Sequence, residues 1–217
     1  MAARVTALKV TVLSTMLADR GLGEWGYSAL VEVDGHKFLF DTGANPDVVL
    51  KNAKSLSIDL SEVEDVVISH NHDDHTGGLV SLRGELMKMN PRAMSRAHVS
   101  ASIFLPRLKA DGSDANGLTP FRAEYERLGG RFILHDSATE LVPGVWFTGP
   151  VNDVVDWTGA QLRRLGVKYL LAGHCTGIEA TMRLRAALGL TRKTAPVSSV
   201  GSSFTLGQGI QPGEIAA

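Results

Sequence analysis

Cysteine, aromatic residues and long apolar runs are scarce in this sequence. A single cysteine, Cys175, cannot form an intrachain disulfide, and one cysteine fits a reducing compartment such as the cytoplasm. Aromatic residues make up only 6% of the chain. No apolar run reaches about 18 residues, the length that a membrane-spanning helix needs. Residues 10–16 are interrupted by polar side chains and favour a strand over the apolar core of a secretory signal. The sequence therefore predicts a protein of the cytoplasm with no membrane partner.

An excess of positive charge is also lacking. The formal net charge is −1, and Lys and Arg do not cluster, so the charge pattern argues against a nucleic-acid partner. A small-molecule substrate is the better expectation. With 44% hydrophobic and 21% charged residues, the composition is ordinary for a globular protein. We expect one domain over residues 1–217, with a frayed tail from about residue 207.

Apolar periodicity predicts alternating strands and helices, which indicates an α/β fold. A continuous apolar run, residues 63–69, favours a strand that is buried on both faces. Residues 106–120 are rich in Gly, Asp and Pro and predict a long surface loop. The other expected strands are 10–16, 27–33, 37–41, 93–100, 131–135, 144–148, 167–173 and 197–206, and the expected helices are 46–56, 78–89, 121–128, 158–166 and 177–189.

The segment ISHNHDDHTGG at residues 68–78 follows the buried strand and concentrates side chains that bind metals. Alternate residues of an extended segment share a face, so His70 and His72 can reach one ion there, whereas in a helix they could not. Asp74 and His75 follow where the chain can curl and present a second pair of ligands. We expect the glycine pair at 77–78 to allow a tight turn into the next helix. The spacing predicts a metal site rather than a polar loop with scattered histidines.

The same residues resemble a known family. His70-Asn71-His72-Asp73-Asp74-His75 matches the signature of the metallo-β-lactamase superfamily, and FLFDTG at 38–43 resembles the strand and turn upstream of it. EWGYSALVEVDG at 24–35, SHNHDDHTGGL at 69–79 and AGHCTG at 172–177 are similar to a narrower branch. That branch is the 7,8-dihydropterin-6-methyl-4-(β-D-ribofuranosyl)aminobenzene 5'-phosphate synthase-like one. The resemblance implies an αββα sandwich, shortened here, with a zinc site at its rim.

The resemblance also assigns ligands. It makes His70 and His72 ligands of a first metal, Asp74 and His75 ligands of a second, and His174 the final histidine ligand. As a carboxylate at the metal, Asp74 is also expected to be catalytic and to orient the attacking water. Members of the branch carry a further segment with Gly-Cys-Ser-His and Gly-Gly-Phe-His motifs, whereas residues 148–156 here run straight on. The third ligand of the first metal should lie in that absent segment. The resemblance therefore implies one or two Zn²⁺ ions, and ligand counting favours about one that is tightly held.

Other polar residues have competing interpretations. His98 and His135 each follow or end a predicted strand and could reach the same rim, although a lone histidine is more often structural. Asp41 either hydrogen-bonds a ligand histidine or simply forms the turn of its DTG sequence. Cys175 is expected to point away from the metal that His174 binds. Two remaining candidates have simple interpretations, a solvent-facing side chain for His36 and a turn for Asp153.

Together these patterns predict a zinc-dependent hydrolase or transferase that acts on a small molecule through a metal-activated water or a metal-polarised oxygen. The resemblance suggests a pterin-related phosphate compound as substrate. Two alternatives stay open at this point. In one, the shortened chain is a catalytically impaired metal-binding or ligand-binding protein. In the other, it forms a homo-oligomer in which a partner chain completes the site.

Overall fold

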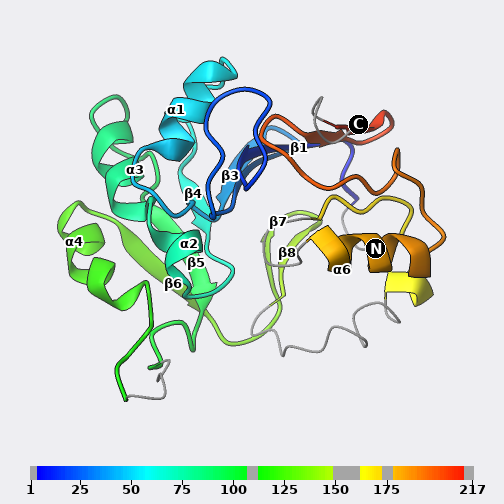
Figure 1. Ribbon diagram of the computed structural model, residues 1–217. Helices are drawn as coiled ribbons and strands as arrows, with labels where there is room; N and C mark the ends of the chain where they lie inside the picture. The colour runs from blue at the N-terminus through cyan, green and yellow to red at the C-terminus, as the bar shows by residue number, and fades with distance from the viewer. Residues whose placement is uncertain (1–3, 107–111, 149–161, 173–177, 213–217) are drawn as a thin grey trace.

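A mixed sheet of eight strands runs through the centre of the protein (Figure 1). The computed structural model describes residues 4–106, 112–148, 162–172 and 178–212. The strand order is β10-β9-β1-β2-β3-β4-β5-β6. The strands are β1 (Leu8–Ser14), β2 (Ser28–Val33), β3 (His36–Phe40), β4 (Asp65–Val67), β5 (Arg96–Ser100), β6 (Arg131–His135), β9 (Ser203–Thr205) and β10 (Gly209–Gln211).

Strand direction changes across the sheet and sets where the site lies. The neighbours β10, β9, β1, β2 and β3 pair antiparallel, whereas β3, β4, β5 and β6 pair parallel to one another. Parallel strands end at the same edge of a sheet. The segments that follow β3, β4, β5 and β6 therefore meet at one edge, and the histidine-rich segment is one of them.

Helices cover one face of this sheet. They are α1 (Val48–Ser55), α3 (Leu79–Leu86) and α4 (Arg122–Arg127), with a short 3₁₀ turn, η1 (Thr119–Phe121), before α4. Alternation along β5 shows how the face is chosen, because Ala97 and Val99 are fully buried in the core while Arg96 and His98 lie on the opposite face. The core packs α1 and α3 against β1 to β5, and the buried hydroxyl of Tyr125 donates to the Met94 carbonyl at 2.7 Å.

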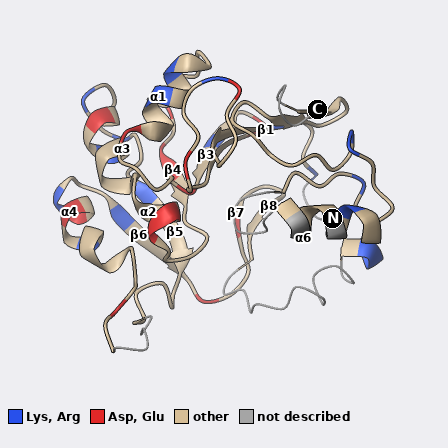
Figure 2. Cartoon of the chain, in the orientation of Figure 1, with Lys and Arg blue, Asp and Glu red and all other residues tan. Residues whose placement is uncertain are grey.

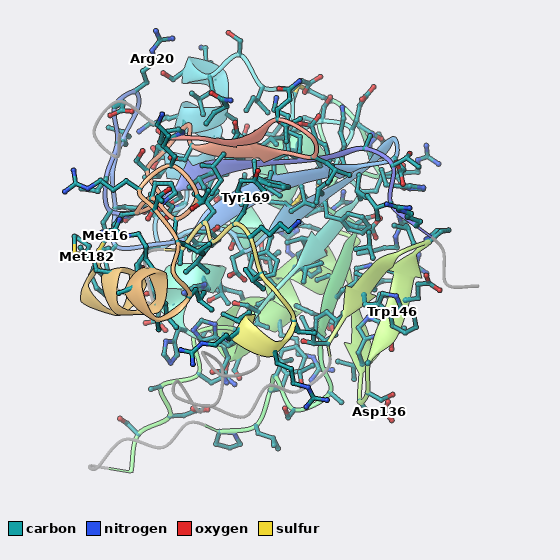
Figure 3. All side chains as sticks on the ribbon, turned by 90° about the vertical axis from the view of Figure 1, so that its right-hand side faces the viewer. Met16, Arg20, Asp136, Trp146, Tyr169 and Met182 are labelled. Carbon is teal, nitrogen blue, oxygen red and sulfur yellow. The ribbon has the colours of Figure 1, made fainter. Side chains whose placement is uncertain are left out.

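A second, smaller layer lies on the other face. The antiparallel ribbon of β7 (Thr139–Val142) and β8 (Val145–Phe147) is followed outward by α6 (Ile178–Ala187), as Figure 1 shows. Phe147 of β8 contacts the His135 ring with 4.8 Å between the ring centroids. Trp146 points to solvent, with 56% of its surface exposed (Figure 3). The order of layers is the expected αββα, with a second sheet of two strands in the described part of the chain.

Several expected elements differ in the structure. Residues 167–172 form no strand, because the Leu170 amide bonds to the Thr194 carbonyl and only Ala172 pairs, as an isolated bridge with Val197. Tyr169 instead packs its ring on Phe204 of β9 (Figure 3). The ribbon strand β7 was missed. Of the expected helix 158–166, residues 158–161 lie outside the described part of the chain, and residues 162–164 are helical.

The expected fraying from about residue 207 is also wrong as far as the described chain extends. Residues Gly209–Gln211 form β10 and pair with β9. Gly207 and Gly209 adopt positive φ angles of 85° and 84°, which glycine reaches without a steric penalty, so the chain can reverse direction there. Ile210 is then buried, with 8% of its surface exposed. The glycines that suggested a loose tail thus build a hairpin.

Charge is spread over the described surface. Figure 2 shows Lys and Arg on several elements of both layers rather than gathered on one, and acidic residues on α2 (Asp73–Thr76). None of the helices in the described ranges is both long and apolar enough to cross a membrane.

Candidate active site

Three imidazole rings meet where the chain leaves β4. The segment after Val67 stays extended at His72, with φ −78° and ψ 146°, and then enters the single turn of α2. The ring centroid of His70 lies 4.4 Å from that of His72 and 4.1 Å from that of His75. The extended conformation expected for His72 is confirmed, and a helical turn, not a loop, presents Asp74 and His75.

Asp41 bonds directly to His75 and reaches His70 through Ser69. Its carboxylate is fully buried. Oδ1 accepts a hydrogen bond from the Ser69 amide at 2.8 Å, and Oδ2 accepts one from the Ser69 hydroxyl at 2.7 Å. The same oxygen, Oδ2, lies 2.7 Å from Nδ1 of His75. The interpretation of Asp41 as the hydrogen-bonding partner of a candidate ligand histidine is therefore confirmed. With Nδ1 bound to Asp41, Nε2 is the His75 atom that could bind a metal.

The electrostatics favour neutral imidazole at His70. Burial, followed by the charge of the nearby His75, lowers the pKa of His70 to about 4. A histidine with this pKa is neutral near pH 7, and neutral imidazole is the form that binds metals. At Tyr27, which is partly buried near Asp41, burial of the hydroxyl followed by the charge of Asp41 raises the pKa to about 12.

Backbone hydrogen bonds fix the histidine segment to the loops before it. The Tyr27 amide donates to the Asp74 carbonyl at 3.0 Å, and the Thr42 amide donates to the His75 carbonyl at 2.8 Å. Glu24 holds the next stretch of chain, because its carboxylate accepts the amides of Ala44 and Asn45. The site is therefore built on three segments that are tied together.

The glycine pair serves a different purpose from the expected turn. Gly77 has an ordinary helical φ of −61°, so the backbone conformation does not require glycine. A Cβ at Gly77 would instead collide with the carbonyl oxygen of Ala44, and one at Gly78 with that of Thr42. The pair is needed because the backbone of residues 42–44 packs directly on α2.

Asp74 lies on the more accessible side of the cluster. Its Oδ1 is 4.0 Å from His72 Nδ1, and 18% of its side chain is exposed, against 42% for His72. The predicted fifth ligand, His174, and its neighbour Cys175 lie outside the described residues, as does Asp153. In the ranges that the structure describes, no three His, Cys, Asp or Glu side chains are spaced to hold one metal ion together.

His98 and His135 do not join this cluster. His98 Nδ1 lies 3.0 Å from His135 Nε2, and His98 Nε2 lies 2.9 Å from Asp65 Oδ1. Asp65 also forms a two-pronged ion pair with Arg96, at 2.6 Å for each contact. Both histidines thus belong to a polar network on the sheet face toward β7 and β8, which supports their structural interpretation. His36 is exposed, as expected.

The residues at the site suit zinc in their chemistry. Zinc binds imidazole nitrogen and carboxylate oxygen, and a carboxylate behind a ligand histidine is a common arrangement at zinc sites. His70, His72 and His75 supply imidazole nitrogens and Asp74 supplies a carboxylate. Asp41 is the carboxylate behind a ligand histidine, His75. Ser69 was not among the residues predicted for the site, although its place at the end of a buried strand and directly before the first histidine could have pointed to it.

Known proteins resemble this chain in sequence. Residues 26–89 match the family model described as the metallo-beta-lactamase superfamily. The chain belongs to that superfamily. It is 30% identical over 159 residues to the 7,8-dihydropterin-6-methyl-4-(beta-D-ribofuranosyl)-aminobenzene-5'-phosphate synthase of Methanocaldococcus jannaschii. That match covers 69% of this chain and 53% of the relative, so the chain spans about half the length of this curated relative.

A shorter match and a solved structure agree with the superfamily. Over 52 residues the chain is 40% identical to the Anti-Pycsar protein Apyc1 of Saccharibacillus brassicae, which covers 24% of this chain and 20% of that protein. The crystal structure of a diphosphatase from the PhnP family superposes with a TM-score of 0.52 at 16% identity, covering 86% of this chain and 84% of that one. The structural likeness establishes the metallo-beta-lactamase fold.

Proposed function

We propose that this chain is a zinc-dependent hydrolase or transferase of the metallo-beta-lactamase superfamily that acts on a small molecule. One observation carries the proposal, namely the convergence of the His70, His72 and His75 rings at the edge where the parallel strands end. A buried carboxylate behind one of these rings strengthens it, because such a pair orients a histidine for metal binding.

The residues would divide the work as follows. His70, His72, Asp74 and His75 would hold zinc, with His174 as a further ligand from outside the described residues. When bound, zinc acts as a Lewis acid that lowers the pKa of water and polarises a carbonyl or phosphoryl oxygen. Asp74, which is partly exposed, would be the catalytic carboxylate that positions the attacking group. Asp41 and Ser69 would keep the histidine rings in place.

A pterin-related phosphate compound is the substrate that we propose. The support is the 30% identity to a protein named for the synthesis of a dihydropterin ribofuranosyl-aminobenzene phosphate. A bound zinc would also suit the anionic oxygens of a phosphate ester. Because the chain spans about half of that relative, a second copy of the chain could supply groups that the site lacks.

Metal analysis combined with an activity assay tests the proposal. Purified protein should contain zinc after dialysis, and zinc-loaded protein should turn over a dihydropterin diphosphate ester, alone or with a ribofuranosylaminobenzene phosphate. His70→Ala should abolish this turnover. His36→Ala is the matched control, because His36 is an exposed histidine away from the cluster, and it should leave turnover unchanged. Protein that binds no zinc and is inactive would contradict the proposal, whereas zinc without turnover would favour a metal-binding protein.

A further inference from the structure

The hydroxyl of Ser69 lies between the buried carboxylate and the first histidine. Ser69 Oγ is 2.7 Å from Asp41 Oδ2 and 2.8 Å from His70 Nδ1. Both distances are those of good hydrogen bonds. A serine hydroxyl has one hydrogen to donate, so it can donate to only one of these two neighbours and must accept from the other.

The surroundings decide which neighbour receives the hydrogen. An ionised carboxylate can only accept, so if Ser69 donated to His70, two lone pairs would face each other at 2.7 Å on the Asp41 side. If Ser69 donates to Asp41, its oxygen accepts a hydrogen from His70 Nδ1 and both contacts are satisfied. The hydrogens then run in one direction, from His70 through Ser69 to Asp41.

This direction has a consequence for the ring of His70. A neutral imidazole carries its hydrogen on one nitrogen only, and the other nitrogen keeps a lone pair that can bind a metal. With the hydrogen on Nδ1, the lone pair of His70 is on Nε2. His75 reaches the same state directly, because its Nδ1 bonds to Asp41 at 2.7 Å.

We propose that Ser69 is a positioning residue for His70. Because its hydroxyl donates to Asp41, its oxygen accepts from His70 Nδ1, and this selects the Nδ1–H tautomer of His70. One carboxylate thereby sets the tautomers of two histidines, one directly and one through a hydroxyl. The inference rests on the proposed metal site for its purpose, but the tautomer itself is a property of the metal-free protein.

The test is nitrogen NMR of ¹⁵N-histidine-labelled, metal-free protein at pH 8, where the shifts of the two ring nitrogens identify the tautomer directly. Wild-type protein should show His70 with its hydrogen on Nδ1. Ser69→Ala should convert much of His70 to the Nε2–H form, and Ser69→Thr, which keeps the hydroxyl, should restore Nδ1–H. Ser100→Ala removes a buried hydroxyl that bonds to Ser102, and should leave the His70 signals unchanged.

A second measurement separates this inference from the proposed function. Zinc affinity, measured by competition with a chelator, should fall about 10- to 100-fold in Ser69→Ala and recover in Ser69→Thr, as for other residues that orient ligands. An Nε2–H tautomer in the wild-type protein, or an Nδ1–H tautomer that survives in Ser69→Ala, would overturn the inference. A serine-dependent Nδ1–H tautomer in protein that binds no zinc would uphold it and refute the proposed function instead.

Discussion

Asp41 Oδ2 accepts a hydrogen bond from His75 Nδ1 at 2.7 Å, and neither side chain has more than 5% of its surface exposed. A buried carboxylate is costly unless hydrogen bonds satisfy it. Here three donors from two residues satisfy it, and the same three bonds fix the end of β4 to α2. Asp41 therefore supports both the stability of the fold and the orientation of the site.

Asp41→Asn should remove the carboxylate without adding backbone strain. Asp41 has a positive φ of 56°, which Asn tolerates about as well as Asp, so the substitution changes the carboxylate and little else. The amide can accept at one oxygen only and turns its NH₂ group toward a donor. We expect the free energy of unfolding to fall by about 2 kcal/mol, measured by urea denaturation.

Asp59→Asn is the control for this variant. Asp59 is an exposed carboxylate that bonds to Ser61, and its loss should change stability little. Equal unfolding midpoints for Asp41→Asn and wild type would show that the carboxylate network contributes nothing to the fold.

Gly77→Ala should be strongly destabilising despite its helical φ. Because the added Cβ meets the backbone oxygen of Ala44 rather than a mobile side chain, α2 must move away from residues 42–44. We expect a loss of about 3 kcal/mol, in the range of overpacked cores, and weaker binding of any metal.

Gly84→Ala tests the same substitution without the collision. Gly84 lies in α3, and its added Cβ would sit 3.8 Å from Leu128 Cδ1, an ordinary contact. Alanine favours a helix over glycine by about 1 kcal/mol, so this variant should be slightly more stable than wild type. Thermal denaturation of the two variants side by side measures the contrast, and similar melting temperatures would contradict the close packing on α2.

Acid should weaken the fold through Asp65. Burial acts to raise the pKa of Asp65, but hydrogen bonds from His98 and Arg96 lower it from 3.8 to about 2. A lowered pKa in the folded state means that the contribution to stability is complete above about pH 4 and disappears as the pH falls toward 2. One pKa unit corresponds to about 1.4 kcal/mol, so this shift corresponds to at most about 2.5 kcal/mol, and solvent screening of the partly exposed pair reduces the contribution to about 2 kcal/mol or less.

The pH profile of Asp65→Asn isolates this contribution. The difference in unfolding free energy between wild type and variant should be fully present near about pH 7, because Asp65 is ionised there in both the folded and the unfolded state, and should shrink as the pH is lowered from about 4. Histidines away from Asp65 titrate alike in both proteins and cancel in the difference, whereas His98 bonds to Asp65 and belongs to the network that the variant disrupts. If the difference in unfolding free energy stayed unchanged down to about pH 2, ionised Asp65 would not be the source of the stability.

The sequence predicted the fold best where local pattern and packing agree. The strand at 131–135 was placed to the residue, since a glycine pair at 129–130 marks its start and the polar residues at 136–137 mark its end. The strand at 167–173 failed because an apolar run cannot say whether a partner strand is available, and Leu170 bonds to Thr194 instead. The hairpin at 207–211 was missed because its glycines favour either a turn or a loose end, and only contact with β9 decides.

For the site, spacing located the histidines but not their partners. His70, His72 and His75 were predicted from sequence because they are close along the chain. The bond from Asp41 to His75 spans 34 residues, so Asp41 could be named only as a candidate, and Ser69 was not considered. The pairing of His98 with His135 depends on the register of β5 and β6, which no local pattern sets.

The last prediction concerns how much zinc each chain holds. A catalytic zinc normally has three protein ligands, and Asp74, His75 and His174 would supply them, whereas His70 and His72 leave a second ion one ligand short. We expect about one zinc per chain after dialysis against a mild chelator, measured by elemental analysis. Asp74→Ala should lose it while the far-UV circular dichroism stays unchanged, because Asp74 is not part of the core.

The double variant His98→Ala and His135→Ala is the control for this count. These two rings bond to each other and to Asp65, so folded protein without them should keep the same zinc content as wild type. His75→Ala should lose zinc and some stability as well, because the ring is buried against Asp41. Two zinc equivalents that survive the chelator in a monomeric double variant would show that the ligand count is wrong and that the chain completes both positions by itself.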